Sequence, residues 1–368
     1  MRGFLLATNG APSNRDTRRR FEQWASNPKC GANTVSAVHN VRMVDVAKKV
    51  GIRPTFGASP FALGHGEQFE RNLLANEAER LSRELHRTPL LTDEQTGFLD
   101  LRIKSNGGTD KSLRDLDQAV EQSIDFLRSA GAARGADVLD LPGIVAALTV
   151  RIPKGVMLPE ALLIIDVVTV TPVDVDGEVR ASLSVGEIKT YPDRGGETKR
   201  GQLAQARAQL GLYLHALEVV VAGFGADERP VLNEDGFLVM TKPGTDFPSV
   251  RTGENLRYQA DRAARGFEQL ENIAGLLPKG ASDVIDAILA ADTHYCEACL
   301  EFCDLAERCH ATAIKNHDPV ILGDAMSQLL GDADLRRVAE LLDGAPPTDI
   351  REQEMADRLR AAEEPGWE

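Results

Sequence analysis

Two carboxylates and one lysine in the middle of the chain have the types and spacing needed for metal-assisted hydrolysis. Asp166 interrupts the apolar run LLIIDVV, where an ionised carboxylate is costly unless it is paired or binds a metal. Glu187 and Lys189 are two residues apart in an extended segment, so both side chains lie on the face opposite Ile188. Carboxylates suit Mg²⁺ or Mn²⁺, and the lysine can orient an attacking water or stabilise the transition state of phosphodiester hydrolysis. The competing interpretation is a surface Glu–Lys salt bridge with an incidental Asp166.

A β-hairpin is expected to bring these residues together. The segments LLIIDVVTVTPV and VRASLSVGEIKTY are rich in β-branched and apolar residues, and the turn pair Asp176-Gly177 lies between them. Asp166 and Glu187 are nearly equidistant from this turn. We therefore expect the two carboxylates to lie roughly opposite each other on neighbouring strands.

The segment after the hairpin predicts a helix over residues 201–221 with a polar ridge. The ridge residues recur at helical spacing and are Gln202, Gln205, Gln209 and Tyr213. A neighbouring apolar stripe consists of Leu203, Ala206, Leu210, Leu214 and Leu217. The helix is expected to pack by the stripe, so that the ridge can hold Lys189 and a phosphate by hydrogen bonds. The alternative is an ordinary amphipathic helix with solvated glutamines.

Taken together, these motifs resemble the PD-(D/E)XK nucleases and, through Gln209-x-x-x-Tyr213, their RecB-like branch. The matching residues are Asp166, the run GEIK at 186–189, and QLGLY at 209–213; Ile165 stands where proline is common. The resemblance implies an α/β restriction-endonuclease-like core, a central mixed β-sheet flanked by helices. It also implies that Asp166, Glu187, Lys189, Gln209 and Tyr213 serve a Mg²⁺- or Mn²⁺-dependent deoxyribonuclease. The expected substrate is single-stranded or end-containing DNA, which favours an exonuclease over a sequence-specific endonuclease.

The resemblance further implies an earlier acidic residue or histidine shortly after a glycine. The segment ALGHGEQFERNLL contains Gly66-x-x-x-Glu70 at the expected spacing. Glu70 would then be a third metal ligand beside Asp166 and Glu187, or a general base. His65 and Glu67 are the other candidates for this position, and a solvated charge at the start of an amphipathic helix is the alternative.

The five cysteines fall in two places, which favours metal binding over disulfides or scattered core positions. Cys30 stands alone, and four more follow in HYCEACLEFCDLAERCH, namely Cys296, Cys299, Cys303 and Cys309. Four clustered thiolates could bind Zn²⁺ and leave Cys30 free. Alternatively, four cysteines including Cys30 could hold a [4Fe–4S] cluster.

The layout of these cysteines resembles the iron–sulfur branch of the same nucleases, including AddB-like proteins and the CRISPR-adaptation nucleases. There one upstream cysteine joins three that follow the nuclease core as C-x2-C-x5-C, and the cluster links the two chain ends. This chain has one cysteine too many. In one set, Cys303-x5-Cys309 is the last pair of the motif, and Cys299 or Cys296 is the cysteine before it. In the other set, Cys296-x2-Cys299 is the first pair, Cys309 completes the motif and Cys303 is spare. Four of the five are expected ligands, and Cys30 and Cys309 belong to each of these sets.

The pattern of segments predicts one compact α/β domain wrapped by helices. Expected elements are helices over 66–86, 112–129, 201–221 and 254–277, a strand over 236–242, and two or three short helices in the last sixty residues. The expected organisation is a basic segment with the first cysteine (1–60), the nuclease core (61–290), the cysteine-rich segment (291–320) and a helical acidic tail (321–368).

Charge is distributed unevenly along the chain, which bears on its partners. The formal net charge is −14, but residues 1–60 carry ten Lys and Arg against three acids, so the other 308 residues sum to −21. A phosphate-contacting patch is expected from Arg15, Arg18, Arg19, Arg20, Lys48 and Lys49, with a solvated arm as the alternative. We expect DNA as a partner, bound locally or with the help of a second protein.

Other partners and locations follow from what the sequence lacks. It contains no G-x4-G-K-[ST] motif, so any helicase or ATPase would be a separate subunit. Its apolar stretches, such as 162–168 and 217–224, are too short to span a bilayer, and the N-terminus has no sustained apolar region, so a cytoplasmic location is expected. The resemblance to the RecB-like nucleases implies a setting in repair, recombination or antiviral defence. The alternative functions are a catalytically silent DNA-binding or scaffold subunit and a zinc-binding regulator.

Overall fold

The computed structural model divides into two compact units. It describes residues 23–25, 27–39, 41–53, 60–95, 97–102, 113–152, 161–274, 284–296, 299, 303–331 and 333–363. Unit 1 combines Arg19–Gly57 with Asn272–Glu368, and unit 2 spans Ala58–Glu271. This differs from the single compact domain expected, because residues from both ends of the chain share a core that is separate from the core of the sheet.

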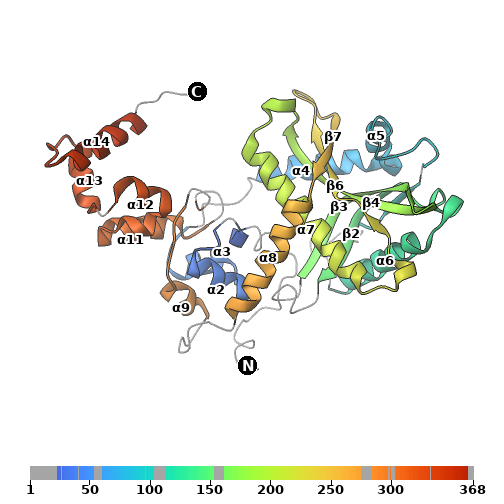
Figure 1. The fold of residues 1–368 in the computed structure, drawn as a ribbon, viewed down its shortest axis with the longest axis horizontal. Helices are drawn as coiled ribbons and strands as arrows, with labels where there is room; N and C mark the ends of the chain where they lie inside the picture. The colour runs from blue at the N-terminus through green and yellow to red at the C-terminus, as the bar shows by residue number, and fades with distance from the viewer. Residues whose placement is uncertain are drawn as a thin grey trace. The chain divides into compact units, whose positions relative to one another are not determined.

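Unit 2 is built on one mixed seven-stranded β-sheet in the order β1-β2-β3-β4-β6-β7, with β5 paired to β4 (Figure 1). The strands are β1 (Phe98–Asp100), β2 (Ile144–Ile152), β3 (Ala161–Val175), β4 (Glu178–Pro192), β5 (Val231–Leu232), β6 (Asp235–Thr241) and β7 (Pro248–Asn255). β2, β3 and β4 run antiparallel to one another, whereas β1 is parallel to β2 and β6 is parallel to β4. The expected α/β class with a mixed, helix-flanked sheet is confirmed.

Helices cover both faces of this sheet. They are α4 (Pro60–Leu73), α5 (Ala75–Leu85), α6 (Leu113–Ala132), α7 (Arg200–Ala222) and α8 (Arg257–Ala274), with 3-10 turns η2 (Gly135–Val138), η3 (Gly195–Glu197) and η4 (Ala226–Glu228). α4 and α5 share a core with Val167, Ile188 and Phe237 of the sheet. α6 and α7 pack against β2 and β4 on the other face (Figure 1). These four helices bury apolar residues against the sheet, as a layered α/β unit requires, whereas α8 packs on α7 through Gln259 and Phe267.

The helix expected over 66–86 is two helices, and the expectation of one is wrong. α4 ends at Leu73 and α5 begins at Ala75, and Asn76, Glu77 and Ala78 have φ values of 50°, 56° and 59°. A left-handed run cannot continue a right-handed helix, so the chain changes direction there. The change has a packing reason, because buried residues on both sides of the break reach the same core.

Several strands gave no recognised signal in the sequence. β1, β2 and β7 were not predicted, and the helix expected to start at residue 254 begins at Arg257, after β7. β2 has the sequence IVAALTVRI, and most of its residues are buried on both faces of the strand. Its sequence therefore lacks the alternation of apolar and polar residues that marks a half-buried strand. The expected hairpin, the helix over 201–221 and the strand near 236–242 are confirmed as β3 and β4, α7 and β6.

Unit 1 joins an N-terminal helical segment to the C-terminal third of the chain. Its helices are α2 (Gly31–His39), α3 (Met43–Lys49), α9 (Val284–Ala290), α11 (Ala306–Asn316), α12 (Asp324–Leu330), α13 (Leu335–Leu342) and α14 (Ile350–Glu363), with the 3-10 turn η5 (Pro319–Leu322). Val46 and Ile288 are fully buried in one core that draws on both parts of the chain. The amide of Ala32 donates to the carbonyl of Asp292 at 3.2 Å, so backbone bonds also link them.

The acidic tail expected over 321–368 is helical in its described part. α13 and α14 pack on a small core, and Arg337 of α13 forms an ion pair with Glu352 of α14 at 2.7 Å. Within the ranges that the structure describes, no helix has both the length and the apolar content needed to cross a membrane.

Candidate active site and cysteine cluster

The β3–β4 hairpin sets Asp166 opposite Glu187. Its paired residues run from Val175–Glu178 beside the turn to Val167–Gly186, and the same register continued by one residue sets Asp166 opposite Glu187. Asp166 Oδ2 accepts a hydrogen bond from the amide of Ile188 at 3.0 Å. The two carboxylates therefore occupy facing positions on adjacent strands, as the distances from the turn predicted.

Lys189 lies against Glu187 on that face of β4. Its Nζ is 2.7 Å from Glu187 Oε1, and the two side chains are 21% and 1% exposed. Ile188 packs into the core on the side of α4 and α5, so Glu187 and Lys189 face α7. A buried carboxylate is thus paired with a partly exposed ammonium, which can also reach a ligand from solvent.

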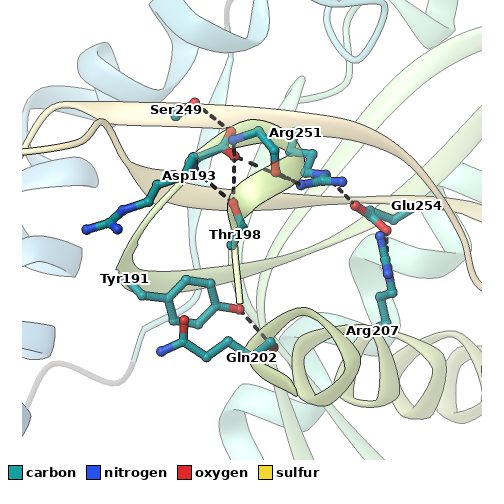
Figure 2. Close-up of polar contacts among 10 residues, drawn as sticks. Tyr191, Asp193, Thr198, Gln202, Arg207, Ser249, Arg251 and Glu254 are labelled. Carbon is teal, nitrogen blue, oxygen red and sulfur yellow. Dashed lines mark hydrogen bonds and ion pairs between the residues drawn. The ribbon is translucent and has the colours of Figure 1, made fainter. Parts of the chain in front are cut away.

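Tyr191 is the next residue on the same face, and the sequence analysis did not select it. Its hydroxyl donates to the carbonyl of Gln202 in the first turn of α7 at 3.1 Å (Figure 2). Burial, together with the charges of Glu187 and Glu254, raises the pKa of Tyr191 to about 12, so this phenol stays a donor at neutral pH. The alternation Glu187, Lys189, Tyr191 was the signal that could have identified it.

α7 presents a partly buried version of the predicted polar ridge. Gln205 is exposed and Gln202 half-buried, whereas Gln209 is 3% exposed and Tyr213 fully buried. The predicted apolar stripe is buried along its length. Gln209 Oε1 has no hydrogen-bond partner among the described residues, and a buried acceptor of this kind is one that water or a bound group usually satisfies.

Glu70 lies on α4, near the end of β1. The pKa of Arg102 is raised by hydrogen bonds to Asp100 and by the charge of Glu70, which places Glu70 beside this pair. Asp100 pairs with Ala146, in the row of the sheet next to the one that holds Asp166. Glu70 therefore lies on the α4 side of the sheet, which is the face opposite the one that carries Glu187 and Lys189, and its role as a third ligand stays a prediction.

The other candidates for that position lie in solvent. His65 Nε2 is 3.3 Å from Asp246 Oδ1 in an exposed pair. Glu67 is also exposed. Asp100, which the sequence analysis did not select, is a partly buried acid at the same end of the sheet and carries its own arginine, Arg102, at 2.8 Å.

β2, which pairs with β3 on the side away from β4, is locally distorted beside Asp166. Ala147 of β2 has a φ of 59°, and its two neighbours in β2 pair with the two neighbours of Asp166 in β3. A left-handed conformation costs a residue with a Cβ about 1–2 kcal/mol. Such strain tends to accumulate where a site fixes the backbone, so this conformation is consistent with a functional position at Asp166.

Gly186 allows the sheet to pack tightly directly before Glu187. A Cβ at this position would lie 2.3 Å from Phe237 and 2.7 Å from Val167. We expect Gly186→Ala to reduce the free energy of unfolding by about 1–3 kcal/mol, because Phe237 is fully buried and cannot move without strain. Thermal unfolding measures this effect. Gly201→Ala is the control, since nothing lies within 4 Å of its Cβ position and helix propensity predicts a slight gain. Equal melting temperatures for the two variants would contradict the close approach.

A second polar cluster adjoins Tyr191 and was also missed. Glu254 of β7 bridges Arg207 of α7 and Arg251 of β7 (Figure 2). Asp193, directly after β4, accepts from Ser249 Oγ at 3.1 Å and so fixes the loop before α7. These residues are distant in sequence, and only the pairing of β6 with β7 brings them to the site.

The cysteines lie in unit 1, where both chain ends meet. Cys30, Cys299 and Cys309 are buried, and Cys296 Sγ is 3.8 Å from Cys299 Sγ. Asn27, three residues before Cys30, donates to Cys299 Sγ at 3.2 Å. The amide of Cys303 donates to the carbonyl of Cys299, and Cys303 packs against the core that contains Cys30.

Four of these thiols lie close enough to affect one another. Burial raises the pKa of Cys303, and the thiols of Cys299, Cys309 and Cys30 raise it further. Cys30 likewise adds to the raised pKa of Cys309. Burial also raises the pKa of Cys299, and the neighbouring thiol of Cys296 adds to this rise. Within the part of the chain that the structure describes, no three or more His, Cys, Asp or Glu side chains form a ready-made group for a single metal ion.

The basic patch expected near the N-terminus is only partly described. Arg15, Arg18, Arg19 and Arg20 lie outside the described residues. Lys49 Nζ is 3.4 Å from Asp286, and Lys48 Nζ is 4.0 Å from Asp45, so each described lysine of the patch has an acidic neighbour.

No protein-family model, no curated protein and no solved structure matches this chain.

Proposed function

We propose that the chain is a metal-dependent DNA nuclease that hydrolyses phosphodiester bonds at Asp166, Glu187 and Lys189. The observation that carries the proposal is the facing register of Asp166 and Glu187, with Lys189 Nζ 2.7 Å from Glu187. Three charged groups from two adjacent strands thus share one face of the sheet, beside α7. A surface salt bridge does not account for this, because Glu187 is 1% exposed and burying an ion pair is costly.

The donor set fits a hard divalent cation. Asp166 and Glu187 would hold Mg²⁺ or Mn²⁺, with Glu70 as the further candidate ligand, since all three supply carboxylate oxygens. When bound, such an ion lowers the pKa of a water and neutralises charge that develops on the phosphate. Lys189 is anchored by Glu187 and partly exposed, so its ammonium can donate to a phosphate oxygen or to the attacking water.

The residues around this set position it. Tyr191 ties β4 to the start of α7, which carries Gln209 and Tyr213 along the side that packs on the sheet. The buried Oε1 of Gln209 accepts a hydrogen bond from a donor that enters the site. The motif resemblance supports single-stranded or end-containing DNA as substrate, exonucleolytic cleavage, and a separate helicase or ATPase as partner in repair, recombination or defence.

Cleavage of labelled DNA tests the proposal directly. Full-length protein, purified without oxygen, is incubated with Mg²⁺, Mn²⁺ or Ca²⁺ and with linear single-stranded, linear double-stranded or circular single-stranded DNA. We expect cleavage of linear single strands with Mg²⁺ or Mn²⁺, and little cleavage of circles, because an exonuclease needs an end. Degradation of circles at the same rate would replace the exonuclease with an endonuclease. No cleavage of any substrate would overturn the proposal.

We further propose that unit 1 holds a [4Fe–4S] cluster through Cys30, Cys299, Cys303 and Cys309. Soft thiolates suit iron–sulfur clusters. Cys30 and Cys303 share a core built from both chain ends, and the thiols of Cys299 and Cys309 are near enough to Cys303 to raise its pKa. The group would tie the N-terminal segment to the C-terminal third of the chain. Cys296 is the fifth cysteine, and its Sγ lies 3.8 Å from Cys299 Sγ.

Single cysteine variants separate the ligands from the fifth thiol. We expect Cys296→Ser to keep the iron content and visible absorption of the wild type, because the four proposed ligands remain. Cys303→Ser should lose most of both, since one of the four proposed ligands is then missing. Anaerobic purification followed by iron, sulfide and zinc assays provides the measurement. Retained iron in Cys303→Ser with loss in Cys296→Ser would reassign the ligand set, and zinc without iron would replace the cluster.

A further inference from the structure

Two arginines on different elements share one buried carboxylate beside the proposed active site. Glu254 is 5% exposed; its Oε2 accepts from Arg207 Nε, and its Oε1 lies 2.9 Å from Arg251 Nε (Figure 2). Arg207 comes from α7 and Arg251 from β7. Each guanidinium is bound to Glu254 through its Nε atom, which fixes the plane of the guanidinium.

The outer edges of these guanidiniums are available to a ligand. The side chains of Arg207 and Arg251 are 37% and 29% exposed. Among the described residues, the two Nη groups of Arg207 have no hydrogen-bond acceptor. Arg251 uses Nη1 on the carbonyl of Gly195 at 3.3 Å, with Asp193 Oδ1 4.0 Å from the same atom, and its Nη2 remains available. A planar guanidinium fixed through Nε presents a fork of donors that matches two phosphate oxygens.

Tyr191 connects this pair to the catalytic face. Its pKa is raised first by burial and then by the negative charges of Glu187 and Glu254, and it is lowered by the positive charges of Arg207 and Arg251. A single phenol is therefore within electrostatic reach of both the proposed metal ligand and the arginine pair. Both guanidiniums are thus near Tyr191, which follows Lys189 on the same face of β4.

The loop that enters α7 extends this positive surface. Residues 193–207 carry four cations and two acids, in a chain whose net charge is −14. Arg194, Lys199 and Arg200 are all exposed. The loop is held in place by Asp193, whose carboxylate accepts from Ser249 Oγ at 3.1 Å and from the amide of Gly195 at 3.0 Å (Figure 2).

We propose that Arg207 and Arg251, with Arg194, Lys199 and Arg200 beside them, bind backbone phosphates of the DNA strand that enters the active site. This rests on the proposed function and deepens it, because it names the surface that holds the substrate next to the cleaved bond. Glu254 is the positioning residue: it orients both guanidiniums and is too buried to contact DNA. The alternative is an ion-pair network that only ties α7 to β7.

The salt dependence of DNA binding separates these two roles. Full-length protein carrying Asp166→Asn, so that the strand stays intact, is titrated against a short fluorescein-labelled single strand in Mg²⁺ at about 50–200 mM salt. Each phosphate contact on single-stranded DNA contributes about 0.7 to the slope of log K against log salt concentration. Arg207→Gln and Arg251→Gln should each lower the slope by about 0.7, and the double variant by about 1.4.

Two further variants serve as controls. Arg207→Lys keeps the charge and should retain the slope, even if it binds more weakly because a lysine has no fork of donors. Arg83→Gln removes an equally charged but more exposed arginine on α5, paired with Glu79, and should leave both slope and affinity unchanged. Melting temperatures of all variants report the structural contribution of the network.

Each result decides between the proposals. An unchanged slope in the double variant, with a lower melting temperature, would overturn the phosphate-binding surface and leave the nuclease proposal intact. The double variant could instead show a reduced slope while the protein with Asp166 intact fails to cleave DNA. That result would support the phosphate-binding surface and overturn the nuclease proposal. Wild-type protein that neither binds nor cleaves DNA would overturn both.

Discussion

Asp166→Asn is expected to reduce Mg²⁺- or Mn²⁺-dependent DNA cleavage by on the order of 10³-fold or more. The substitution keeps the size of the side chain and an oxygen that can accept from the amide of Ile188, so the hairpin should fold as before. It removes one of the two facing carboxylates and so weakens both the attraction for the cation and the stabilisation of charge on the phosphate. Initial cleavage rates at saturating metal and DNA measure the effect.

The matched control lies on the same strand. Asp174 of β3 is exposed near the turn, where its Oδ1 accepts from the amide of Gly177 at 3.0 Å. Asp174→Asn keeps this bond and removes the same charge, so it should cleave DNA at the wild-type rate. Both variants should bind DNA with an affinity similar to that of the wild type, since neither carboxylate contacts the phosphate backbone of the DNA directly.

Two outcomes would contradict the assignment of Asp166. Equal loss in Asp166→Asn and Asp174→Asn would mean that net charge, not the site, limits cleavage. Equal cleavage by wild type and Asp166→Asn would mean that the activity belongs to other residues or to a contaminant. DNA binding without cleavage by the wild type would instead favour a catalytically silent DNA-binding subunit.

Cys30→Ser is expected to destabilise unit 1 while unit 2 keeps its own unfolding transition. A metal group that binds only the folded state adds its binding free energy to folding, on the order of 10 kcal/mol for structural metal sites. Loss of one ligand should therefore lower the melting midpoint of unit 1 by roughly 10 °C or more. The effect should be large because Cys30 connects residues 23–53 to the cysteines of the C-terminal third.

Calorimetry with an iron assay on the same sample tests this expectation. Oxidation or chelation of the wild type should shift the same transition and leave the second one in place. Cys296→Ser provides the control, since its thiol lies outside the proposed set. An unchanged melting profile for Cys30→Ser would exclude a structural cluster that uses this residue, whatever the iron content.

The sequence predicted the hairpin because its signals are local. β-branched residues, the Asp176-Gly177 turn and side-chain alternation fix both the strands and their register. Once the turn is known, the facing positions of Asp166 and Glu187 follow by counting residues. The helical spacing of α7 was equally readable, because its buried stripe recurs at helical intervals.

Elements without a local signal could not be predicted in this way. β2 is buried on both faces, so its residues do not alternate. The break between α4 and α5 depends on packing against the sheet, and β7 depends on pairing with β6, neither of which is visible within a short window of sequence. The same applies to the division into two units, which rests on contacts between the two ends of the chain.

The sequence by itself determined which residues carry the proposed chemistry: the carboxylates, the lysine and the clustered cysteines. Only the tertiary structure decided what surrounds them. Glu254 and its two arginines come from elements far apart along the chain, and Tyr191 gains its importance from contacts with α7. The convergence of Cys30 with the later cysteines likewise arises in a core shared by both chain ends. The type of a residue decides which chemistry its side chain can perform. Long-range packing decides how buried that side chain is, which charges surround it and which groups it contacts, and so where that chemistry is used.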